Sequence, residues 1–495
     1  MATGNLKTNA VKGAGINVIA QFIGTICQTV GVIVLARLLK PTDFGLVAMV
    51  TAFSMWVMNF GENGFAEFII QKEHISKEDV NSIFWLHVFI ASLLALAFIF
   101  FGIFLVDFYS EPALWGIAAA MSTSIILTAF TTSPLALLQR EMKFTSIAIL
   151  QLVAIVLSIV FAIAAAAGGM TYWSVVIRQL TVSMVTAIGA WIFCSWRPGI
   201  PVHLSRAFPG LKYAVQVYCN YSLGYLTKNI DKMLLGKFYG SEFLGNYDRA
   251  YYLSSMPANQ LLFPLSKVAL ATLSRLVNDK ERFIAFYIKA ITILSLLGTF
   301  SALILTLTAE DLILMLLGPK WKDAGRVVMA FGPGIAATLL YGTRTWLHLS
   351  LGTPNRWLRW NIFASIVTIA AFLIAAPYGP VSMAIAYSTT GYVLVVPALW
   401  YGARPIDLSI KAIFVPLSAY FASATTVLIS WVLLSSYWSP LISLLEKLST
   451  LVRILMVSCV ALFFYFAFVI LFQWSFRSIR EILTITRLFF TARRV

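Results

Sequence analysis

Apolar stretches of about 20 residues recur along almost the whole chain, and they leave few folds open to it. A helix needs about 20 apolar residues to cross the hydrocarbon core of a bilayer. Breaks at charge clusters and at Gly or Pro turns separate fourteen such stretches. Only 11% of the 495 residues are charged and 60% are hydrophobic, whereas soluble domains carry about 25% charged residues. We therefore predict an all-α polytopic membrane protein with spans at 13–36, 43–68, 82–106, 113–138, 144–167, 171–196, 210–236, 243–272, 283–308, 324–351, 358–376, 380–401, 410–435 and 451–474.

The net charge of +16 is explained by the connections between spans. If the N-terminus is cytoplasmic, most Lys and Arg residues of the connections also fall on the cytoplasmic side, as the positive-inside rule requires. An odd number of spans would destroy this asymmetry. We expect both termini to be cytoplasmic, an uncleaved first helix, and no nucleic-acid partner.

A weak repeat at an offset of 200 residues divides the first twelve spans into two sets of six. The segments IVLARLLKPTDFG (33–45) and MLLGKFYGSEFLG (233–245) both run from an apolar helix end through a cation and a short turn to a glycine, Gly45 or Gly245. Parallel repeats pack around an axis along the membrane normal, with the substrate between them. We predict an N-terminal six-helix lobe (1–200), a C-terminal six-helix lobe (201–405), an additional helix pair (406–476) and a basic amphipathic tail (477–495).

Ionisable residues lie within several predicted spans, where a central charge costs about 2.5–3.5 kcal/mol and therefore usually faces a bundle interior or a watery cavity. Helical spacing places them in stripes. In the tenth span the stripe lies beyond a predicted break at Pro333-Gly334. The stripes consist of Tyr221, Gly224, Tyr225, Lys228, Asp231 and Lys232 in the seventh span; Asp248, Tyr252, Ser255 and Asn259, beside Arg249, in the eighth; and Tyr341, Arg344, Thr345 and His348 in the tenth. The first half offers Glu62 and Arg178.

Cations outnumber acids in these stripes, and a phosphate or pyrophosphate balances buried Arg and Lys well. Neighbouring hydroxyl and amide groups suit a sugar. We therefore predict pyrophosphate and sugar binding by Lys228, Lys232, Arg249, Arg344, Arg178, Tyr225, Tyr252 and Asn259, with Asp231, Asp248 and Glu62 as counter-charges or coupling-ion sites.

Simpler interpretations stay open. Lys232, Arg249 and Arg178 are placed where they would also reach the interface by snorkelling. Lys228 and Asp231 would form a self-neutralising pair, Glu62 would cap a helix end, and His348 would be a hydrogen-bonded interior histidine. Cys27, Cys194, Cys219 and Cys459 lie in apolar segments without CxxC spacing, so we expect no disulfide, no metal site and no catalytic residue.

The segments LARLLKPTDFGLVAMV (35–50) and LLQREMKF (137–144), together with the two six-helix lobes and the extra pair, carry a family resemblance. The chain resembles the Wzx-type polysaccharide exporters of the multidrug/oligosaccharidyl-lipid/polysaccharide superfamily, most closely the colanic acid and succinoglycan exporter branch. The resemblance implies a flippase that moves undecaprenyl-pyrophosphate-linked oligosaccharide repeat units across a bacterial inner membrane, by alternating access through a cationic central cavity. It implies a transporter that serves exopolysaccharide or O-antigen-type assembly. We expect no cofactor, coupling to a Na⁺ or H⁺ gradient through the acidic residues named above, and a polymerase or glycosyltransferase partner that docks to the basic tail.

Three alternatives remain. A flippase for a lipid II-type peptidoglycan precursor is the nearest alternative, and only the local resemblance to the polysaccharide exporters argues against it. A multidrug or cation antiporter of the same fold would favour an acidic or aromatic cavity, which the surplus of cations argues against. A membrane polymerase or glycosyltransferase would carry a large extramembrane loop with paired carboxylates for acid–base chemistry, and the connections here are short.

Overall fold

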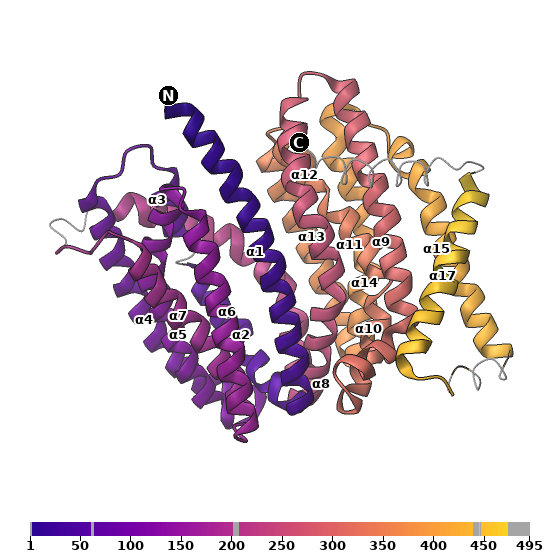
Figure 1. Ribbon diagram of the computed structural model, residues 1–495, viewed down its shortest axis with the longest axis horizontal. Coiled ribbons are helices and arrows are strands. Elements are labelled where there is room, and N and C mark those ends of the chain that lie inside the picture. The colour runs from indigo at the N-terminus through magenta and orange to yellow at the C-terminus, as the bar shows by residue number, and fades with distance from the viewer. Residues whose placement is uncertain (1, 61–63, 201–206, 439–444, 446, 474–495) are drawn as a thin grey trace. The chain divides into compact units, whose positions relative to one another are not determined.

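The computed structural model describes residues 2–60, 64–200, 207–438, 445 and 447–473 (Figure 1). Within these ranges all regular structure is helical. Among the described residues, eleven helices are long and apolar enough to cross a membrane, and one further helix pair passes the same test as a bent span. The predicted all-α polytopic membrane fold is therefore confirmed. Glu62 and the predicted tail at 477–495 lie outside the described residues.

Two elements account for the spans that are not simple helices. The predicted tenth span is bent by 54° between Pro319–Phe331 and Gly334–Ser350, at the predicted Pro333-Gly334 break. The predicted seventh and eighth spans form α8 (Phe208–Arg275), whose 68 residues are interrupted at Gly240 by φ 80° and ψ −174°. A straight helix of that length would measure about 100 Å, against about 30 Å of hydrocarbon. Gly240 thus divides α8 into a first and a second arm, which fit the two predicted spans.

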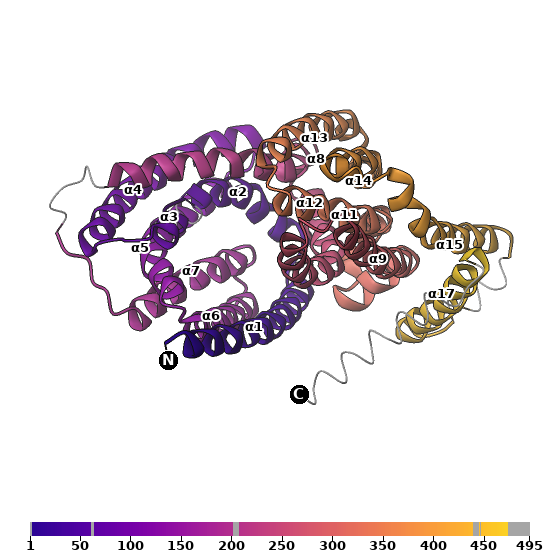
Figure 2. The ribbon, with the colours of Figure 1, turned by 90° about the horizontal axis from the view of Figure 1, so that it is seen from above.

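The chain forms two compact units, Met1–Asp248 with Leu317–Trp321, and Arg249–Leu316 with Lys322–Val495. The lobe boundaries at residues 200 and 405 stay a prediction. In the first unit, α5 contacts α2, α4 and α7, and α6 contacts α1 and α7 (Figure 2). Its helices are α1 (Ala2–Leu38), α2 (Pro41–Phe60), α3 (Ala66–Gln71), α4 (Lys77–Tyr109), α5 (Ala113–Arg140), α6 (Phe144–Ala167), α7 (Trp173–Phe193) and α8 as far as Asp248.

In the second unit, α9 is the central contact. It packs against α10 and α11 on the one hand and against α15 and α17 on the other, while α14 contacts α10, α11 and α13 (Figure 1). Arg453 of α17 forms a bidentate ion pair with Asp311 of α9, which fixes the additional helix pair to the bundle. The helices are the rest of α8, α9 (Lys280–Leu316), α10 (Lys322–Phe331), α11 (Gly334–Gly342), α12 (Arg344–Ser350), α13 (Pro354–Ala375), α14 (Pro380–Ala403), α15 (Ile410–Tyr437) and α17 (Thr450–Gln473).

The two segments that resemble each other in sequence contact each other within the first unit. A Cβ atom on Gly45 would lie 1.7 Å from the carbonyl oxygen of Ser241, and one on Gly245 would lie 1.9 Å from the carbonyl oxygen of Pro41. At the offset of 200, Pro41 corresponds to Ser241 and Gly45 to Gly245, so the contact is reciprocal. Small residues four apart allow such close backbone approach between membrane helices.

A short loop between α9 and α10 also belongs to the first unit. Trp321, at the end of the 3₁₀ turn η3 (Pro319–Trp321), is fully buried. Its indole N–H donates to the carbonyl oxygen of Ala36 at 2.8 Å, and its ring meets Phe44 edge-on at 5.4 Å. Carbonyls in the last turn of a helix have no intrahelical donor, so Trp321 satisfies an acceptor that α1 leaves open.

Candidate functional site

The first arm of α8 presents an open polar face in the first unit. Tyr221, Gly224 and Lys228 are exposed and Tyr225 is half-buried. A Cβ atom added to Gly224 would meet no atom within 4 Å. These residues follow each other at the three- and four-residue spacing of one helix face, so the predicted stripe is a continuous surface of hydroxyl, ring and ammonium groups.

At the Gly240 end of this face, the two arms of α8 form a buried polar network. The Asp231 carboxylate is almost completely buried and accepts from the Tyr247 hydroxyl at 2.7 Å and from the backbone N–H of Lys232 at 2.8 Å. The Lys232 ammonium forms a 2.7 Å ion pair with Asp248. The positive φ of Gly240, which a residue with a side chain rarely adopts, turns the chain so that residues 16 apart meet.

This network changes the charge balance that the sequence suggests. Lys232 and Asp248 neutralise each other with side chains that are 17% and 11% exposed. Lys228 stays at the exposed part of the face. Lys228 is thus the more exposed of the two lysines.

Aromatic side chains extend the polar face toward the start of α8. Tyr218 stacks on Trp56 of α2 at 6.2 Å and meets Phe60 edge-on at 5.1 Å. Sequence reasoning concentrated on ionisable groups and missed this cluster. The available signal is that Tyr218 precedes Tyr221 by three residues and so continues the same stripe. Arg178, the other predicted site residue of this unit, is half-buried in α7.

The second unit holds the remaining predicted residues. The Arg249 guanidinium lies 5.5 Å from the Tyr252 ring, and Asn259 is exposed on the same arm of α8. The Arg344 guanidinium lies 3.5 Å from the Tyr341 ring. Its Nη1 donates to the Tyr341 carbonyl oxygen at 2.7 Å and its Nη2 to the Asn361 side-chain oxygen at 3.4 Å. No carboxylate contacts Arg344 within the described ranges.

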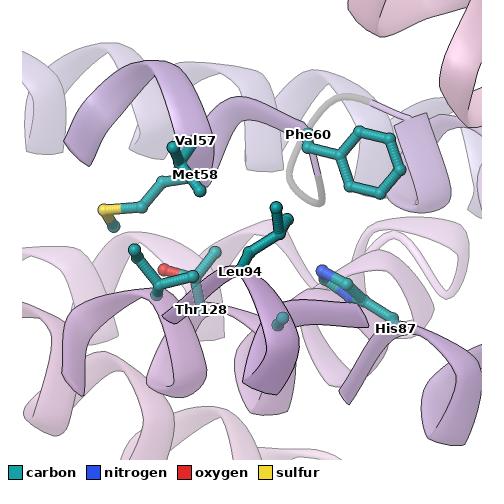
Figure 3. A pocket seen from close by; sticks show the side chains of 8 residues that line it. Val57, Met58, Phe60, His87, Leu94 and Thr128 are labelled. Atoms are coloured by element: carbon teal, nitrogen blue, oxygen red, sulfur yellow. The ribbon is translucent and has the colours of Figure 1, made fainter. Parts of the chain in front are cut away.

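A small pocket with an accessible volume of about 10 Å³ lies between α2, α4 and α5 of the first unit (Figure 3). His87 is buried in its wall, next to Phe60 in the view, and Thr128 adds a hydroxyl on the other side. Its other lining residues are Val57, Met58, Ala91, Leu94 and Ile125. None of the predicted site residues lines this apolar pocket. It is unsuited to a charged diphosphate or a glycan.

Comparison with protein families gives a match over more than half of the chain. A family described as "Polysaccharide biosynthesis protein" matches residues 34–326. The lipopolysaccharide biosynthesis protein WzxC of Escherichia coli (strain K12) is 21% identical over 321 residues, which cover 64% of this chain and 65% of that protein. The succinoglycan biosynthesis transport protein ExoT of Rhizobium meliloti (strain 1021) is 24% identical over 336 residues, 67% of this chain and 68% of that one.

Solved structures show the same fold. The lipid II flippase MurJ, in an inward closed conformation, matches 94% of this chain and 99% of its own with a TM-score of 0.74 and 14% identity. An inward-facing multidrug resistance transporter of the MATE family matches 79% of this chain and 98% of its own with a TM-score of 0.63 and 15% identity. At these identities the likeness concerns the fold alone.

Proposed function

The chain belongs to the polysaccharide biosynthesis protein family, and we propose that it is a flippase for undecaprenyl-pyrophosphate-linked oligosaccharide repeat units. Family membership agrees with the resemblance read from the sequence. The observation that carries the proposal is the open face of the first arm of α8, where Tyr221, Tyr225 and Lys228 are aligned. Such a face would suit a ligand that combines a phosphate with a saccharide.

In the proposed mechanism, Lys228 and Arg344 bind the pyrophosphate, assisted by Lys232, Arg249 and Arg178 in some conformations. The hydroxyl, ring and amide groups of Tyr225, Tyr252 and Asn259 bind the sugars. The prenyl chain stays in the lipid, and alternating access carries the head across a bacterial inner membrane, with both termini cytoplasmic. The product would serve exopolysaccharide or O-antigen-type assembly by a polymerase or glycosyltransferase.

Coupling to a Na⁺ or H⁺ gradient would use the network at Gly240. A cation bound at Asp248 would displace Lys232, because one carboxylate cannot fully neutralise both the bound cation and the Lys232 ammonium. The released Lys232 would then become available to the diphosphate. Asp231, buried beside Tyr247, would serve as a second acidic group, and Glu62 keeps its proposed counter-charge role.

A lipid II-type flippase is the second candidate, favoured by the likeness to MurJ over 94% of the chain. Both candidates carry a prenyl diphosphate, and they differ in the glycan. A cell that lacks its own exopolysaccharide flippase separates them. Restored surface polysaccharide supports the first candidate, whereas rescue of a strain depleted of its lipid II flippase supports the second.

The site assignment is tested by charge removal in that complementation strain. Lys228→Ala and Arg344→Ala should abolish surface polysaccharide and trap lipid-linked repeat units on the inner side. Lys237→Ala is the matched control, since this exposed lysine lies 4.8 Å over the Phe108 ring at the end of the same arm. Unchanged export by both Lys228→Ala and Arg344→Ala, at normal expression, would defeat the assignment.

Water access to the polar face is tested with a charged thiol reagent. Gly224→Cys introduces a thiol into open space on that face. The native Cys219 is exposed on the same arm but lies about 140° away around the helix, at about 100° per residue. In a chain with Cys27, Cys194 and Cys459 replaced by Ser, the reagent should modify position 224 much faster than Cys219. Equal, slow reaction at both would place the predicted polar face in lipid.

A further inference from the structure

One end of the α13–α14 pair in the second unit gathers arginines on aromatic rings. Arg356, in the first turn of α13, lies 4.3 Å from the Tyr401 ring, and its Nη2 donates to the Tyr401 carbonyl oxygen at 2.7 Å. Arg404 follows Tyr401 by three residues and lies 4.1 Å from the Trp400 ring. The two guanidinium groups thus lie on adjacent rings of one helix end. In the sequence, both arginines fall in connections between predicted spans, at 352–357 and 402–409.

Among the residues that the structure describes, acids do not match the positive charge at this end. Within the part of the chain that the structure describes, Arg356 and Arg404 form no ion pair. Asp407, the acid that follows Arg404, pairs with Lys280 at 2.9 Å. Arg359, one turn beyond Arg356, is exposed and adds a third cation.

Two buried hydrogen-bond donors also lack an acceptor there. The Nε atom of Arg356 and the indole nitrogen of the next residue, Trp357, are both buried and meet no acceptor among the described residues. Guanidinium and indole N–H groups donate and cannot accept. Leaving such donors unsatisfied costs about 1–3 kcal/mol each. The complementary partner is therefore a group that only accepts, such as a phosphate oxygen.

The surroundings of this end indicate which kind of molecule would supply such a phosphate. Along α13, the apolar side chains of Leu358, Ile362 and Phe363 are 38%, 43% and 52% exposed, and Trp400 on α14 is 45% exposed. Exposed apolar chains on a spanning helix face lipid tails, while Trp, Tyr and Arg at its end lie at headgroup depth. Basic pockets between helices at the cytoplasmic side bind lipid phosphates.

We propose that this end of α13 and α14 is a binding site for the phosphate headgroup of an anionic phospholipid. Arg356 and Trp357 donate to the phosphate, Arg404 supplies a second cation, and the acyl chains lie along Leu358 and Ile362. The site goes beyond the proposed transport function, because it recognises a resident lipid and requires no carried glycan.

The same rings connect this site to Arg344. The Trp360 ring stacks on Tyr401 at 5.9 Å, and its indole N–H donates to the Tyr341 hydroxyl at 3.1 Å. Tyr341 in turn lies beneath the Arg344 guanidinium. A phosphate that holds Arg356 against Tyr401 would therefore stabilise the stack that positions Arg344. Lipid occupancy would tune the charged site in this way.

The test is a titration of phosphatidylglycerol into the detergent-solubilised full chain, with the unfolding temperature as the readout. We expect stabilisation by phosphatidylglycerol beyond that given by phosphatidylcholine. Because charge-assisted hydrogen bonds are the strong ones, Arg356→Gln should weaken the apparent lipid affinity by about tenfold or more. Arg356→Lys keeps the charge and loses the planar fork, so its lipid affinity should lie between that of the unaltered chain and that of Arg356→Gln. Arg404→Gln should weaken it less than Arg356→Gln.

Arg282→Gln is the matched control, since this arginine is 80% exposed, pairs with Asp279 and lies on α9. Its unfolding temperature should respond to phosphatidylglycerol as that of the unaltered chain does. An unchanged lipid affinity in Arg356→Gln, in protein that is monodisperse and cooperative without lipid, overturns the proposal. Equal stabilisation by inorganic phosphate alone also overturns it, because the acyl chains would then contribute nothing. Transport activity does not enter this readout, so its outcome is independent of the proposed function.

Discussion

The pair of Lys232 and Asp248 provides a quantitative test of the network at Gly240. Both side chains are largely buried and their charged atoms lie 2.7 Å apart. Removing one partner of a buried ion pair costs about 3–5 kcal/mol, because the other charge is left uncompensated. Partial exposure of 17% and 11% favours the lower end, so Lys232→Met and Asp248→Leu should each destabilise the protein by about 3 kcal/mol.

The double variant should behave differently from the sum of the single ones. Replacing both charges by apolar groups of similar volume is often neutral or even stabilising. We therefore expect Lys232→Met with Asp248→Leu to lose at most about 1 kcal/mol, which gives a coupling energy far above the average of about 0.6 kcal/mol for hydrogen bonds between membrane helices. Unfolding of the full chain in mixed micelles by an anionic detergent, followed by tryptophan fluorescence, measures all four corners of the cycle.

The result that would refute this reasoning is additivity. If each single variant loses less than about 1 kcal/mol and the losses add, water screens the pair as it screens surface ion pairs. Lys232 would then be as available to an anionic ligand as Lys228, and the distinction drawn between the two lysines would be wrong.

Three further outcomes are expected. Trp321→Phe keeps an aromatic ring against Phe44 but leaves the Ala36 carbonyl without a donor, so it should lower the free energy of unfolding by about 1–3 kcal/mol; no change would show that water replaces the indole. Arg453→Gln should release α17 from Asp311 and make the helix pair the first segment cut in limited proteolysis, and an unaltered cleavage order would contradict this. Burial raises the pKa of the Cys194 thiol at the end of α7, so less thiolate exists at any given pH. The alkylation rate of Cys194 should therefore rise only at a higher pH than that of a free thiol, and should match that of a free thiol once the protein is unfolded. Fast labelling of the folded protein at neutral pH would contradict the burial.

Much of the fold follows from local patterns in the sequence. Runs of apolar residues predict the spans, and Pro333-Gly334 predicts the bend in the tenth span, because proline and glycine disturb helices wherever they occur. These features depend on residues close together in the chain, so periodicity and composition suffice.

The partners of the charged groups could not be predicted in the same way. Helical spacing suggests that Lys228 lies beside Asp231, because it compares only residues on one helix. The positive φ of Gly240 brings Tyr247 to Asp231 and Asp248 to Lys232 from the second arm of α8. The sequence around Gly240 does not distinguish such a turn from a loop of several residues. Likewise, Arg356 reads as an ordinary loop cation until Tyr401, 45 residues later, is placed beneath it.

The reciprocal contact of Gly45 and Gly245 has a consequence for hybrid proteins. Each glycine accommodates a carbonyl from the other repeat, so a larger residue at either position forces apart the same pair of helix starts. Exchanging only residues 33–45, or only residues 233–245, with a relative whose crossing is wider should therefore produce chains that fail to assemble. Exchanging both segments together should restore assembly, since the two stretches would then diverge as one inherited unit.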